Sequence, residues 1–225
     1  MPAGNRHRDE VRRVVVTRRR ARSPRGSGEI LAEEIIEAAG EILVEHGDDT
    51  AMSIRAVAGR VGVTPPSIYL HFADKEALLD AVCARYFARL DDEMAAASDG
   101  VDDPLERALA LGMAYVRFAV STPVLYRVAF AQPAHEGNPS KVDAVLAASA
   151  YARLVTTITE LADEGMFGHD DVADVVLELW AAAHGVASLM LAKPGLGWGP
   201  DFSQAESLLK SVCLGRAAMA TRDRS

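Results

Sequence analysis

Apolar residues along most of the chain recur with the three-and-four spacing of an amphipathic helix. From Glu29 onward they follow this period, while glutamates fill largely the opposite positions. Gly47 comes just after the last apolar turn, where a glycine commonly ends a helix. The pattern therefore predicts one amphipathic helix from Glu29 to Gly47. Its apolar positions are Leu31, Ile35, Ala38, Ala39, Ile42 and Leu43.

Two short helices separated by a tight turn are predicted next. Ser53 is suited to cap a helix that ends at Gly62, a residue that readily adopts the left-handed conformation. Thr64 is a natural N-cap for the second helix, because the prolines after it fall in the first turn, where a missing N–H costs nothing. This second helix is expected to run from residue 65 to about residue 72.

Helix start signals recur through the rest of the chain. Asp74 is expected to cap a long helix through about Ala97, and the run 103–106 (Asp-Pro-Leu-Glu) is a capping-box arrangement with proline at its first position. No segment shows convincing strand alternation, so the expected fold is all-α with about nine helices. The remaining helices are predicted to begin at Thr122-Pro123 and to span about 143–165, 170–193 and 203 onward, with a loop at 132–140.

The stretch 53–72 has the features of a helix-turn-helix, two short helices joined by a tight turn. Ala58 is small where the helices approach each other. Ser67, Tyr69 and His71 are expected on the outward face, where they can reach base edges and phosphates. The alternative places Tyr69 in the core and uses His71 as a cap. The small core is expected to contain Val57, Val61, Val63, Ile68 and Phe72.

Segment 29–90 resembles the DNA-binding domain of the tetracycline-repressor (TetR) family. The most specific part is 67–79, where the tyrosine, the His-Phe pair and the Lys-Glu-x-Leu run have the usual register of that family. The runs that carry the resemblance are Ile36-Glu37-Ala38-Ala39 through Gly47, Met52-Ser53-Ile54-Arg55-Ala56-Val57-Ala58, Gly62-Val63-Thr64 and Ser67-Ile68-Tyr69-Leu70-His71-Phe72-Ala73-Asp74-Lys75-Glu76-Ala77-Leu78-Leu79.

The resemblance implies a set of DNA contacts in this segment. Arg55 would contact a base or a phosphate, and Lys75 would hold a phosphate. The two adjacent prolines leave few base-reading donors, so readout is expected to depend on thymine methyl groups, on Arg55 and on DNA shape. Thr64, Tyr69 and His71 would touch phosphates or neighbouring bases, and Pro66, Ser67 and Tyr69 would face the major groove.

The resemblance weakens after about residue 95. In 179–189 the Trp-x-x-x-His-Gly pattern is similar to one C-terminal subfamily, and it places Trp180 and His184 on one helix face. These two residues either pack in the core or line a ligand pocket, and an aromatic stripe is compatible with both. The candidate pocket residues are Met113, Tyr115, Phe118, Tyr126, Phe130, Trp180 and His184.

The last two predicted helices have apolar faces with many small residues, and by resemblance they would form a four-helix dimer interface. A dimer would read two half-sites roughly 34 Å apart. An unknown small hydrophobic molecule would act by binding the DNA-competent and incompetent states unequally. The resemblance thus implies a ligand-responsive repressor released from a palindromic operator. The small and apolar positions are Ala181, Ala182, Ala183, Gly185, Ala187, Ser188, Leu208, Leu209, Val212, Leu214 and Ala218.

Charge is distributed unevenly along the 225 residues. Residues 1–28 hold nine arginines against two acidic residues, whereas the whole chain has a net charge of -8. Segment 29–75 contains three basic and nine acidic side chains, although phosphate binding needs positive charge. We therefore expect an N-terminal arm that follows the minor groove, with a disordered or misassigned start and a transit peptide as the alternatives. The arm residues are Arg18, Arg19, Arg20, Arg22 and Arg25.

The remaining features exclude other classes or argue against them. No uninterrupted apolar run approaches the roughly 18–20 residues of a membrane span, and no secretory leader is evident, so a cytoplasmic protein is expected. The two cysteines are isolated. No enzyme activity and no cofactor are expected, because no nucleophile–base pairing, phosphate loop or metal-ligand spacing is visible. His169-Asp170-Asp171 could suggest a metal site, but helix capping explains the aspartates. A helix-turn-helix protein without a ligand is disfavoured by the long segment 91–225, expected to bind ligand and dimerise.

Overall fold

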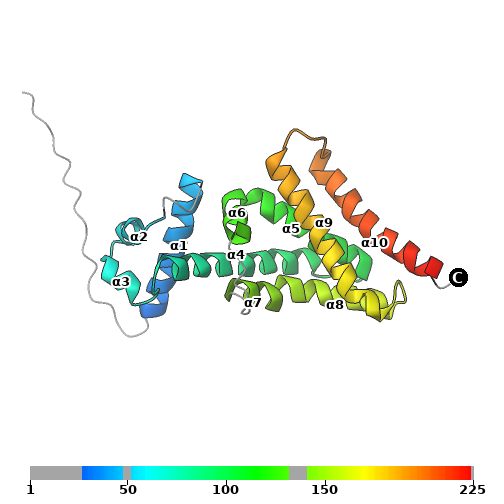
Figure 1. Cartoon of the computed structure of the whole chain (residues 1–225), viewed down its shortest axis with the longest axis horizontal. Coiled ribbons are helices and arrows are strands. Elements are labelled where there is room, and N and C mark those ends of the chain that lie inside the picture. Colours follow the sequence, from blue (N-terminus) through cyan, green and yellow to red (C-terminus); the bar gives the residue numbers. More distant parts are fainter. Residues whose placement is uncertain (1–26, 48–51, 132–140, 224–225) are drawn as a thin grey trace, which may run out of the picture.

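The computed structural model describes residues 27–47, 52–131 and 141–223, and no residue in these ranges lies in a strand (Figure 1). The all-α prediction is therefore confirmed. The helices are α1 (Ser27–His46), α2 (Ile54–Val61), α3 (Pro65–Tyr69), α4 (Lys75–Ser98), α5 (Pro104–Ser121), α6 (Pro123–Ala131), α7 (Lys141–Ala148), α8 (Ala150–Asp163), α9 (Val172–Ala192) and α10 (Ser203–Asp223), with short 3₁₀ turns at His169–Asp171 and Pro200–Phe202.

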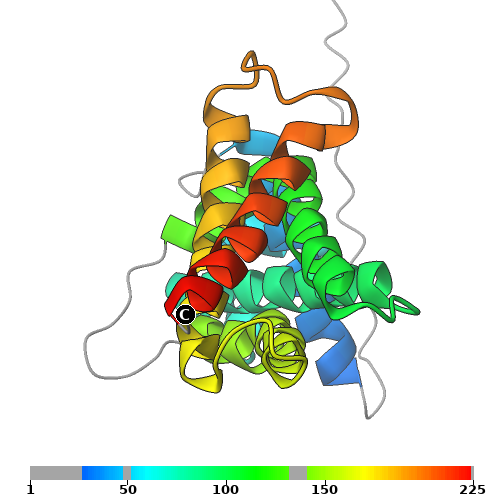
Figure 2. The same cartoon turned by 90° about the vertical axis from the view of Figure 1, so that its right-hand side faces the viewer.

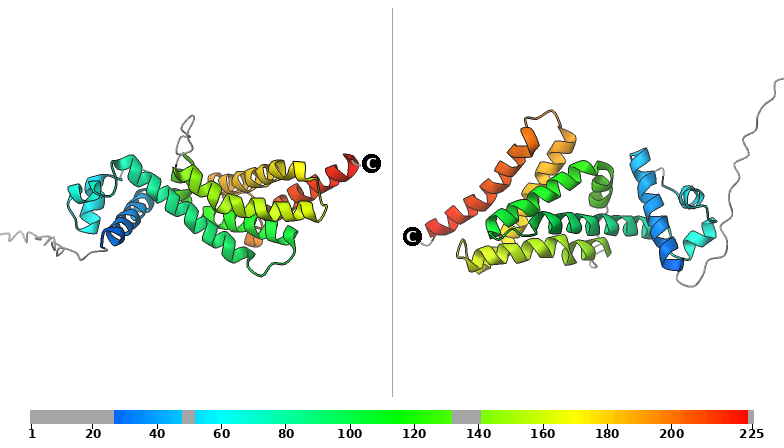
Figure 3. Two further views of the ribbon diagram at one scale, coloured as in Figure 1. Left: turned by 90° about the horizontal axis from the view of Figure 1, so that it is seen from below. Right: turned by 180° about the vertical axis from the view of Figure 1, so that it is seen from behind.

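The long helix α4 joins the two ends of the molecule (Figure 3). Helices α1 to α3 form a small head at one end of α4, and α5 to α10 surround its other end as a larger body. Helix α9 packs against α5, α8 and α10, and α10 also packs on α5. Helices α9 and α10 lie side by side on the outer face of the body (Figure 2).

Local capping chemistry explains where several of these helices begin. The Ser53 hydroxyl accepts a hydrogen bond from the Ala56 N–H at 3.2 Å. The Asp74 carboxylate accepts one from the Ala77 N–H at 2.7 Å, so that both predicted caps are confirmed. Gly62 has φ of 79°, the left-handed conformation expected at the end of α2.

Two boundaries differ from the prediction. The helix expected over 143–165 is divided at Ser149, which has non-helical backbone angles and whose hydroxyl donates to the Val145 carbonyl at 2.6 Å. The bond alone does not account for the break, because Thr156, Thr157 and Thr159 make the same bond inside the unbroken helix α8. Helix α3 ends at Tyr69, before the expected residue 72, and the Thr64 hydroxyl pairs with the Ser67 hydroxyl at 3.0 Å instead of capping the backbone.

The segment His169–Ala192 contains an 18-residue window with a mean hydropathy of 1.7, which by length and composition alone is enough for a membrane span. This segment was not identified from the sequence, because Glu178 and His184 interrupt its apolar run. A core helix passes the same test, and α9 buries Val175, Leu179 and Val186 against the body.

Candidate functional site

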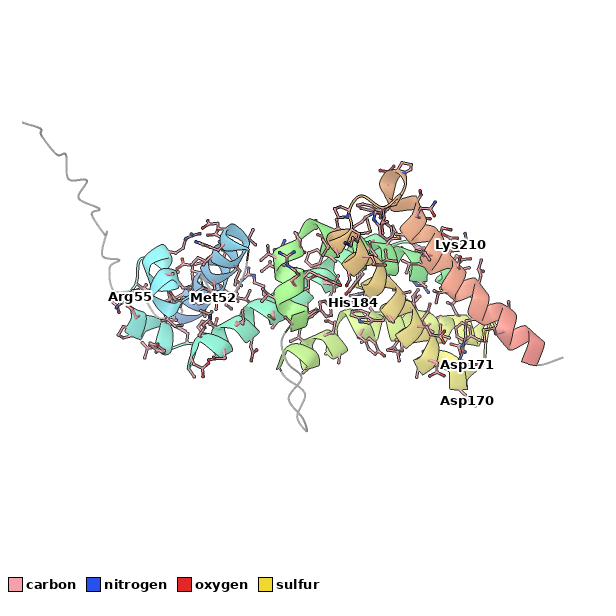
Figure 4. The ribbon with its side chains drawn as sticks, turned by 45° about the horizontal axis from the view of Figure 1, so that its top comes forward. Met52, Arg55, Asp170, Asp171, His184 and Lys210 are labelled. Atoms are coloured by element: carbon pink, nitrogen blue, oxygen red, sulfur yellow. The ribbon has the colours of Figure 1, made fainter. Side chains whose placement is uncertain are left out.

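The head holds its two short helices on α1 through a compact apolar core. Val57, Ala58 and Ile68 are at most 1% exposed. Val61, Val63 and Phe72 are partly buried against this core, as the sequence predicted. Met52 is also fully buried and lies among the helices of the head (Figure 4), although the spacing of the short helices did not identify it. The core fixes α3 at the surface of the head.

The end of α3 exposes apolar side chains to solvent. Tyr69 is 53% exposed, so the alternative that places it in the core is wrong. Leu70 is 85% exposed, and sequence reasoning did not identify it as a surface residue. Pro66 is exposed as well, whereas Ser67 and His71 are half-buried. A side chain as apolar as Leu70 in this position is available to contact another molecule.

Most positive charge near the head is already paired. The Arg60 guanidinium donates to the Glu45 carboxylate at 2.8 Å and to the Glu41 carboxylate at 3.2 Å, and so ties α2 to α1. Arg85 forms an ion pair with Glu33. Arg55 is exposed at the outer end of the head (Figure 4), which leaves its charge available to an anion.

The arginines expected to form the arm, Arg18, Arg19, Arg20, Arg22 and Arg25, lie outside the described residues. Their expected role therefore remains a prediction from sequence. Lys75, expected to hold a phosphate, begins α4 directly after the α3 segment and already interacts with another residue of the chain.

In the body, five of the candidate pocket residues come together from three helices. The Tyr115 hydroxyl of α5 lies 2.8 Å from the His184 Nδ1 atom of α9, and the Tyr126 hydroxyl of α6 lies 3.1 Å from the same atom. The Phe130 ring is 4.6 Å from the His184 ring, and the Trp180 ring is 4.9 Å from the Tyr115 ring, centroid to centroid. We call Tyr115, Tyr126, Phe130, Trp180 and His184 the aromatic cluster.

The polar atoms of the aromatic cluster form a small network without formal charge. The Tyr126 hydroxyl also lies 2.7 Å from the Ser188 hydroxyl, a partner that the sequence analysis assigned to an apolar face. Ser188 is four residues after His184 and thus on the same helix face, so this spacing could have identified it as a partner from the sequence. Burial lowers the pKa of His184 and raises the pKa of Tyr126, so both are neutral near pH 7.

The other two pocket candidates are placed differently. The Phe118 ring packs on the Tyr86 ring at 5.0 Å, and the Arg89 guanidinium lies 5.9 Å from its centroid. Met113 is buried in α5. Next to Tyr115 and Trp180 there is a cavity of only about 10 Å³, which is barely the room that one water needs. A ligand at the aromatic cluster would therefore have to move side chains or helices.

The acidic run after His169 has structural partners. The Asp171 carboxylate accepts the Gly168 N–H at 3.2 Å and pairs with Arg216 at 2.9 Å, which joins the turn before α9 to α10. His169 lies 3.3 Å from the Asp163 carboxylate. Asp170 and Asp171 are at the end of the body in Figure 4. Within the ranges that the structure describes, no group of three or more His, Cys, Asp or Glu residues is placed to hold a metal ion.

The outer faces of α9 and α10 expose large apolar side chains. The expected interface positions divide between two faces, however, because Ala183, Ala187 and Leu209 are buried in the chain's own core and are unavailable to a partner. The large apolar residues exposed on these two helices are Leu177 (60%), Leu189 (51%), Leu208 (49%), Leu214 (46%) and Met219 (59%).

Two family models match the chain, one in the head and one in the body. Residues 35–82 match the model described as bacterial regulatory proteins, tetR family. Residues 108–211 match the model described as tetracyclin repressor-like, C-terminal domain. The chain therefore has both domain types of this family in their usual order.

Curated relatives match over shorter stretches. An uncharacterized HTH-type transcriptional regulator, YobS of Bacillus subtilis (strain 168), is 33% identical over 100 residues, which are 42% of this chain and 49% of that protein. The tetracycline repressor protein class D of Escherichia coli is 40% identical over 60 residues, 27% of each chain. The chain thus spans about half or less of the length of these relatives.

Solved structures match over most of the chain. A protein of unknown function from Rhodococcus sp. RHA1 has a TM-score of 0.72 and 27% identity, covering 83% of this chain and 95% of that one. The fatty acid degradation regulator FadR from Bacillus halodurans has a TM-score of 0.64 and 19% identity, covering 81% and 98%. RolR in complex with resorcinol has a TM-score of 0.62 and 19% identity, covering 87% and 93%. The last two likenesses concern the fold alone.

Proposed function

Because the chain belongs to the tetracycline-repressor (TetR) family, we propose that it is a cytoplasmic transcriptional regulator, most simply a repressor, that binds operator DNA as a homodimer and releases it on binding a small molecule. Residues 29–90 would bind DNA, with residues 1–28 as a basic arm, and residues 91–225 would dimerise and bind the effector. The exposed end of α3 is the observation on which the DNA-binding proposal chiefly depends.

Tyr69 and Leu70 would enter the major groove, with Arg55 beside them. Both side chains are exposed, although the rest of the head has a well-packed core. A leucine that is 85% exposed is costly in water but can pack on a thymine methyl group, which only the major groove displays. The same groove or the neighbouring phosphates would also be approached by Thr64, Pro66, Ser67 and His71. Lys75 would hold a phosphate.

The aromatic cluster would bind the effector. Its hydrogen-bonding groups are neutral, because burial keeps His184 unprotonated and the two tyrosines protonated. A neutral aromatic molecule with a hydroxyl or amide group could replace the bond between Tyr115 and His184. Since the adjoining cavity is so small, binding would separate α5 from α9 and so shift the body between two states. Met113 and Phe118 lie on α5 and would move with that helix.

The homodimer would form through α9 and α10. Leu177, Ala181, Gly185 and Leu189 follow one another at four-residue spacing and form a stripe along α9. A Cβ added at Gly185 would meet no atom within 4 Å, so the middle of this stripe is open toward a partner helix. Leu208, Val212, Gly215 and Met219 form the matching stripe on α10. Small residues at the centre of each stripe would allow two copies to approach closely.

DNA selection tests the proposal. The purified protein is incubated with a pool of random duplexes, bound DNA is sequenced, and affinity is measured by fluorescence anisotropy at about 150 mM salt. We expect an inverted repeat to be selected, and Leu70→Ala to weaken its binding about fivefold or more. Leu196→Ala is the matched control, because Leu196 is 53% exposed and lies far from the head in sequence.

Two results would contradict the DNA-binding proposal. One is equal affinity for the selected repeat and for a shuffled duplex of the same composition. The other is an equal effect of Leu70→Ala and Leu196→Ala, which would mean that α3 does not face the DNA. Release of the selected duplex by a neutral aromatic compound, lost in Trp180→Ala, would separately test the effector site.

A further inference from the structure

The Tyr86 hydroxyl of α4 is a buried polar group that the fold leaves unpaired. The side chain is 2% exposed. Within the ranges that the structure describes, its oxygen is the one buried side-chain polar atom without a hydrogen-bond partner. An unpaired group of this kind costs free energy, because water bonds to it in the unfolded chain, and folded proteins rarely leave one without a reason. The Tyr86 hydroxyl therefore has an unused capacity to bind another molecule.

Packing holds the Tyr86 ring in place. The Phe87 ring meets it edge to face at a centroid distance of 5.3 Å, and the Phe118 ring of α5 lies at 5.0 Å. The Thr122 hydroxyl is near enough to lower the pKa of Tyr86, but it donates its own hydrogen to the Phe118 carbonyl at 2.6 Å. The two hydroxyls are not in hydrogen-bonding geometry. The Tyr86 hydroxyl is thus fixed in the body with no protein group to accept its hydrogen.

Three tyrosine hydroxyls from α4, α5 and α6 converge on one region of the body. Burial raises the pKa of Tyr86, the Thr122 hydroxyl lowers it, and the nearby Tyr126 raises it further. Burial also raises the pKa of Tyr115, and Tyr126 and Tyr86 add to that shift. Because such charge effects need proximity, Tyr86 belongs to the same polar region as the tyrosines of the aromatic cluster. Near neutral pH it is a protonated donor.

Aromatic rings connect Tyr86 with the aromatic cluster. The Phe87 ring, which contacts Tyr86, lies 5.3 Å from the Phe130 ring, and the Phe130 ring lies 4.6 Å from the His184 ring. Tyr86 is also among the residues that line a groove of about 710 Å³ between α1, α4 and α6, so open space reaches this side chain. Tyr86 therefore adjoins both this groove and the site proposed for the effector.

We propose that the Tyr86 hydroxyl donates a hydrogen bond to an oxygen of the effector and selects effectors by that oxygen. The inference rests on the proposed effector site at the aromatic cluster. One hydroxyl of the effector would replace the bond between Tyr115 and His184, and a carbonyl group on the same molecule would accept the Tyr86 hydrogen. A neutral carbonyl fits better than a carboxylate, because a buried charge would lose more hydration than one hydrogen bond returns.

The unpaired state of Tyr86 makes it suited to discriminate between ligands. The Tyr115 hydroxyl must give up its contact of 2.8 Å with His184 before it can bond to a ligand. The Tyr86 hydroxyl gives up no bond to the protein, so the gain from a ligand acceptor is not offset by such a loss. A ligand without the acceptor leaves the hydroxyl unpaired, and sites of this kind reject such analogues strongly.

Two phenols of nearly the same shape test the proposal. para-Hydroxyacetophenone has a carbonyl oxygen where para-isopropylphenol has a methyl group, and the meta isomers direct the same groups differently. Binding to the full chain is measured by isothermal titration calorimetry at a pH at which all four phenols are neutral. For at least one isomer, we expect Tyr86→Phe to lower the preference for the ketone over the alkyl phenol about fivefold or more. Affinity for the alkyl phenol should not fall.

Tyr151→Phe is the matched control. Tyr151 lies on α8, and its ring is 5.8 Å from the Trp180 ring, so this variant removes a tyrosine hydroxyl beside the aromatic cluster. It should leave the preference for the ketone unchanged. Stability gives a second measurement. Tyr115→Phe loses the bond to His184 and should lower the midpoint of urea unfolding, whereas Tyr86→Phe loses no bond and should not.

Three results would overturn the role of Tyr86. The first is a preference for the ketone that Tyr86→Phe leaves unchanged. The second is an equal loss of affinity for both phenols, which would mean that Tyr86 only supports the packing. The third is a fall in the urea midpoint as large as that of Tyr115→Phe, which would mean that the hydroxyl is bonded within the fold, for example through a held water.

The same titrations separate this inference from the proposed effector site. If none of the phenols bound the unaltered protein, both the site and the role of Tyr86 would be wrong. If Trp180→Ala removed the binding while Tyr86→Phe left the preference for the ketone unchanged, the site would stand and the role of Tyr86 alone would be wrong.

Discussion

Gly112 of α5 and Leu209 of α10 lie in direct contact, because a Cβ atom placed on Gly112 would be 2.9 Å from the Leu209 Cδ1 atom. Leu209 is fully buried and cannot turn into solvent to relieve such a clash. Gly112 also lines the small cavity next to Tyr115 and Trp180. The absence of one side chain therefore lets α10, a helix of the proposed dimer interface, pack on α5, the helix that contributes Tyr115 to the aromatic cluster.

Gly112→Ala should destabilise the protein. Overpacking a core costs about 1–3 kcal/mol. The better helix propensity of alanine offsets about 1 kcal/mol. We expect a net loss of about 1 kcal/mol in the free energy of unfolding, measured by urea titration. Gly59→Ala is the matched control, since nothing lies within 4 Å of the added Cβ in α2, and it should not destabilise the chain. Equal effects of the two alanines would contradict the tight contact.

His184 should make stability depend on pH below neutrality. Burial lowers the pKa of His184, so the unfolded chain, with a His pKa near its usual value of about 6.5, binds the proton more readily than the folded one. The free energy of unfolding should therefore fall as the pH drops from about 6.5 toward the lowered pKa, and then level off. His184→Gln removes this titration, so its stability should fall less over the same range. Parallel curves for the two proteins would contradict the prediction.

The helix boundaries show how much of the fold could be predicted from sequence. Ser53, Gly62 and Asp74 act locally, through their own side chains or backbone angles, and their neighbours in sequence were enough to identify them. The break at Ser149, which has non-helical backbone angles, was missed because no glycine or proline marks it in the sequence. The exposure of Leu70 was missed because α3 ends early, and its end depends on how the head packs.

The candidate site was predictable in its residue types but less so in its arrangement. Trp180 and His184 were paired by helical spacing, which is local. That the Tyr115 and Tyr126 hydroxyls converge on one nitrogen of His184 depends on the packing of α5, α6 and α9, which no local pattern specifies. The groove of about 710 Å³ that α1, α4 and α6 line was not expected at all, because it arises between helices that are far apart in sequence.

The two cysteines should be inert in the folded protein. Burial raises the pKa of Cys83 to about 12 and that of Cys213 to about 11, and the thiolate is the reactive form. We expect no reaction with a thiol reagent such as dithionitrobenzoate at pH 8 over the time in which the unfolded chain reacts completely. Rapid labelling of the native protein would contradict the burial of these side chains, and mass spectrometry would identify which cysteine reacted.

Removal of residues 1–26 should reduce the salt dependence of operator binding. The described part of the head has its Arg60 charge paired with Glu41 and Glu45, so little positive charge remains for phosphates. Each phosphate contact that is lost lowers the slope of log K against log salt by about 0.9. Five arm arginines would account for a decrease of up to about 4.5 for each protomer that is bound. An unchanged slope would mean that the arm does not contact DNA, and replacement of the five arginines by alanine would separate charge from length.

Gly185→Leu should prevent dimerisation without unfolding the monomer. The added side chain meets no atom of its own chain at the Cβ position, and leucine favours a helix more than glycine does. In a dimer the same side chain would enter the closest approach of two α9 helices and hold them apart. Sedimentation equilibrium should then show the dissociation constant of the dimer raised about tenfold or more.

Gly185→Ala, the smaller change at the same position, should perturb the dimer less. The operator affinity of Gly185→Leu should fall in parallel with its dimerisation, because a monomer reads only one half-site. A Gly185→Leu protein that remained as dimeric as Gly185→Ala would place the interface elsewhere, since the face that contains Gly185 would then not be covered by a second copy.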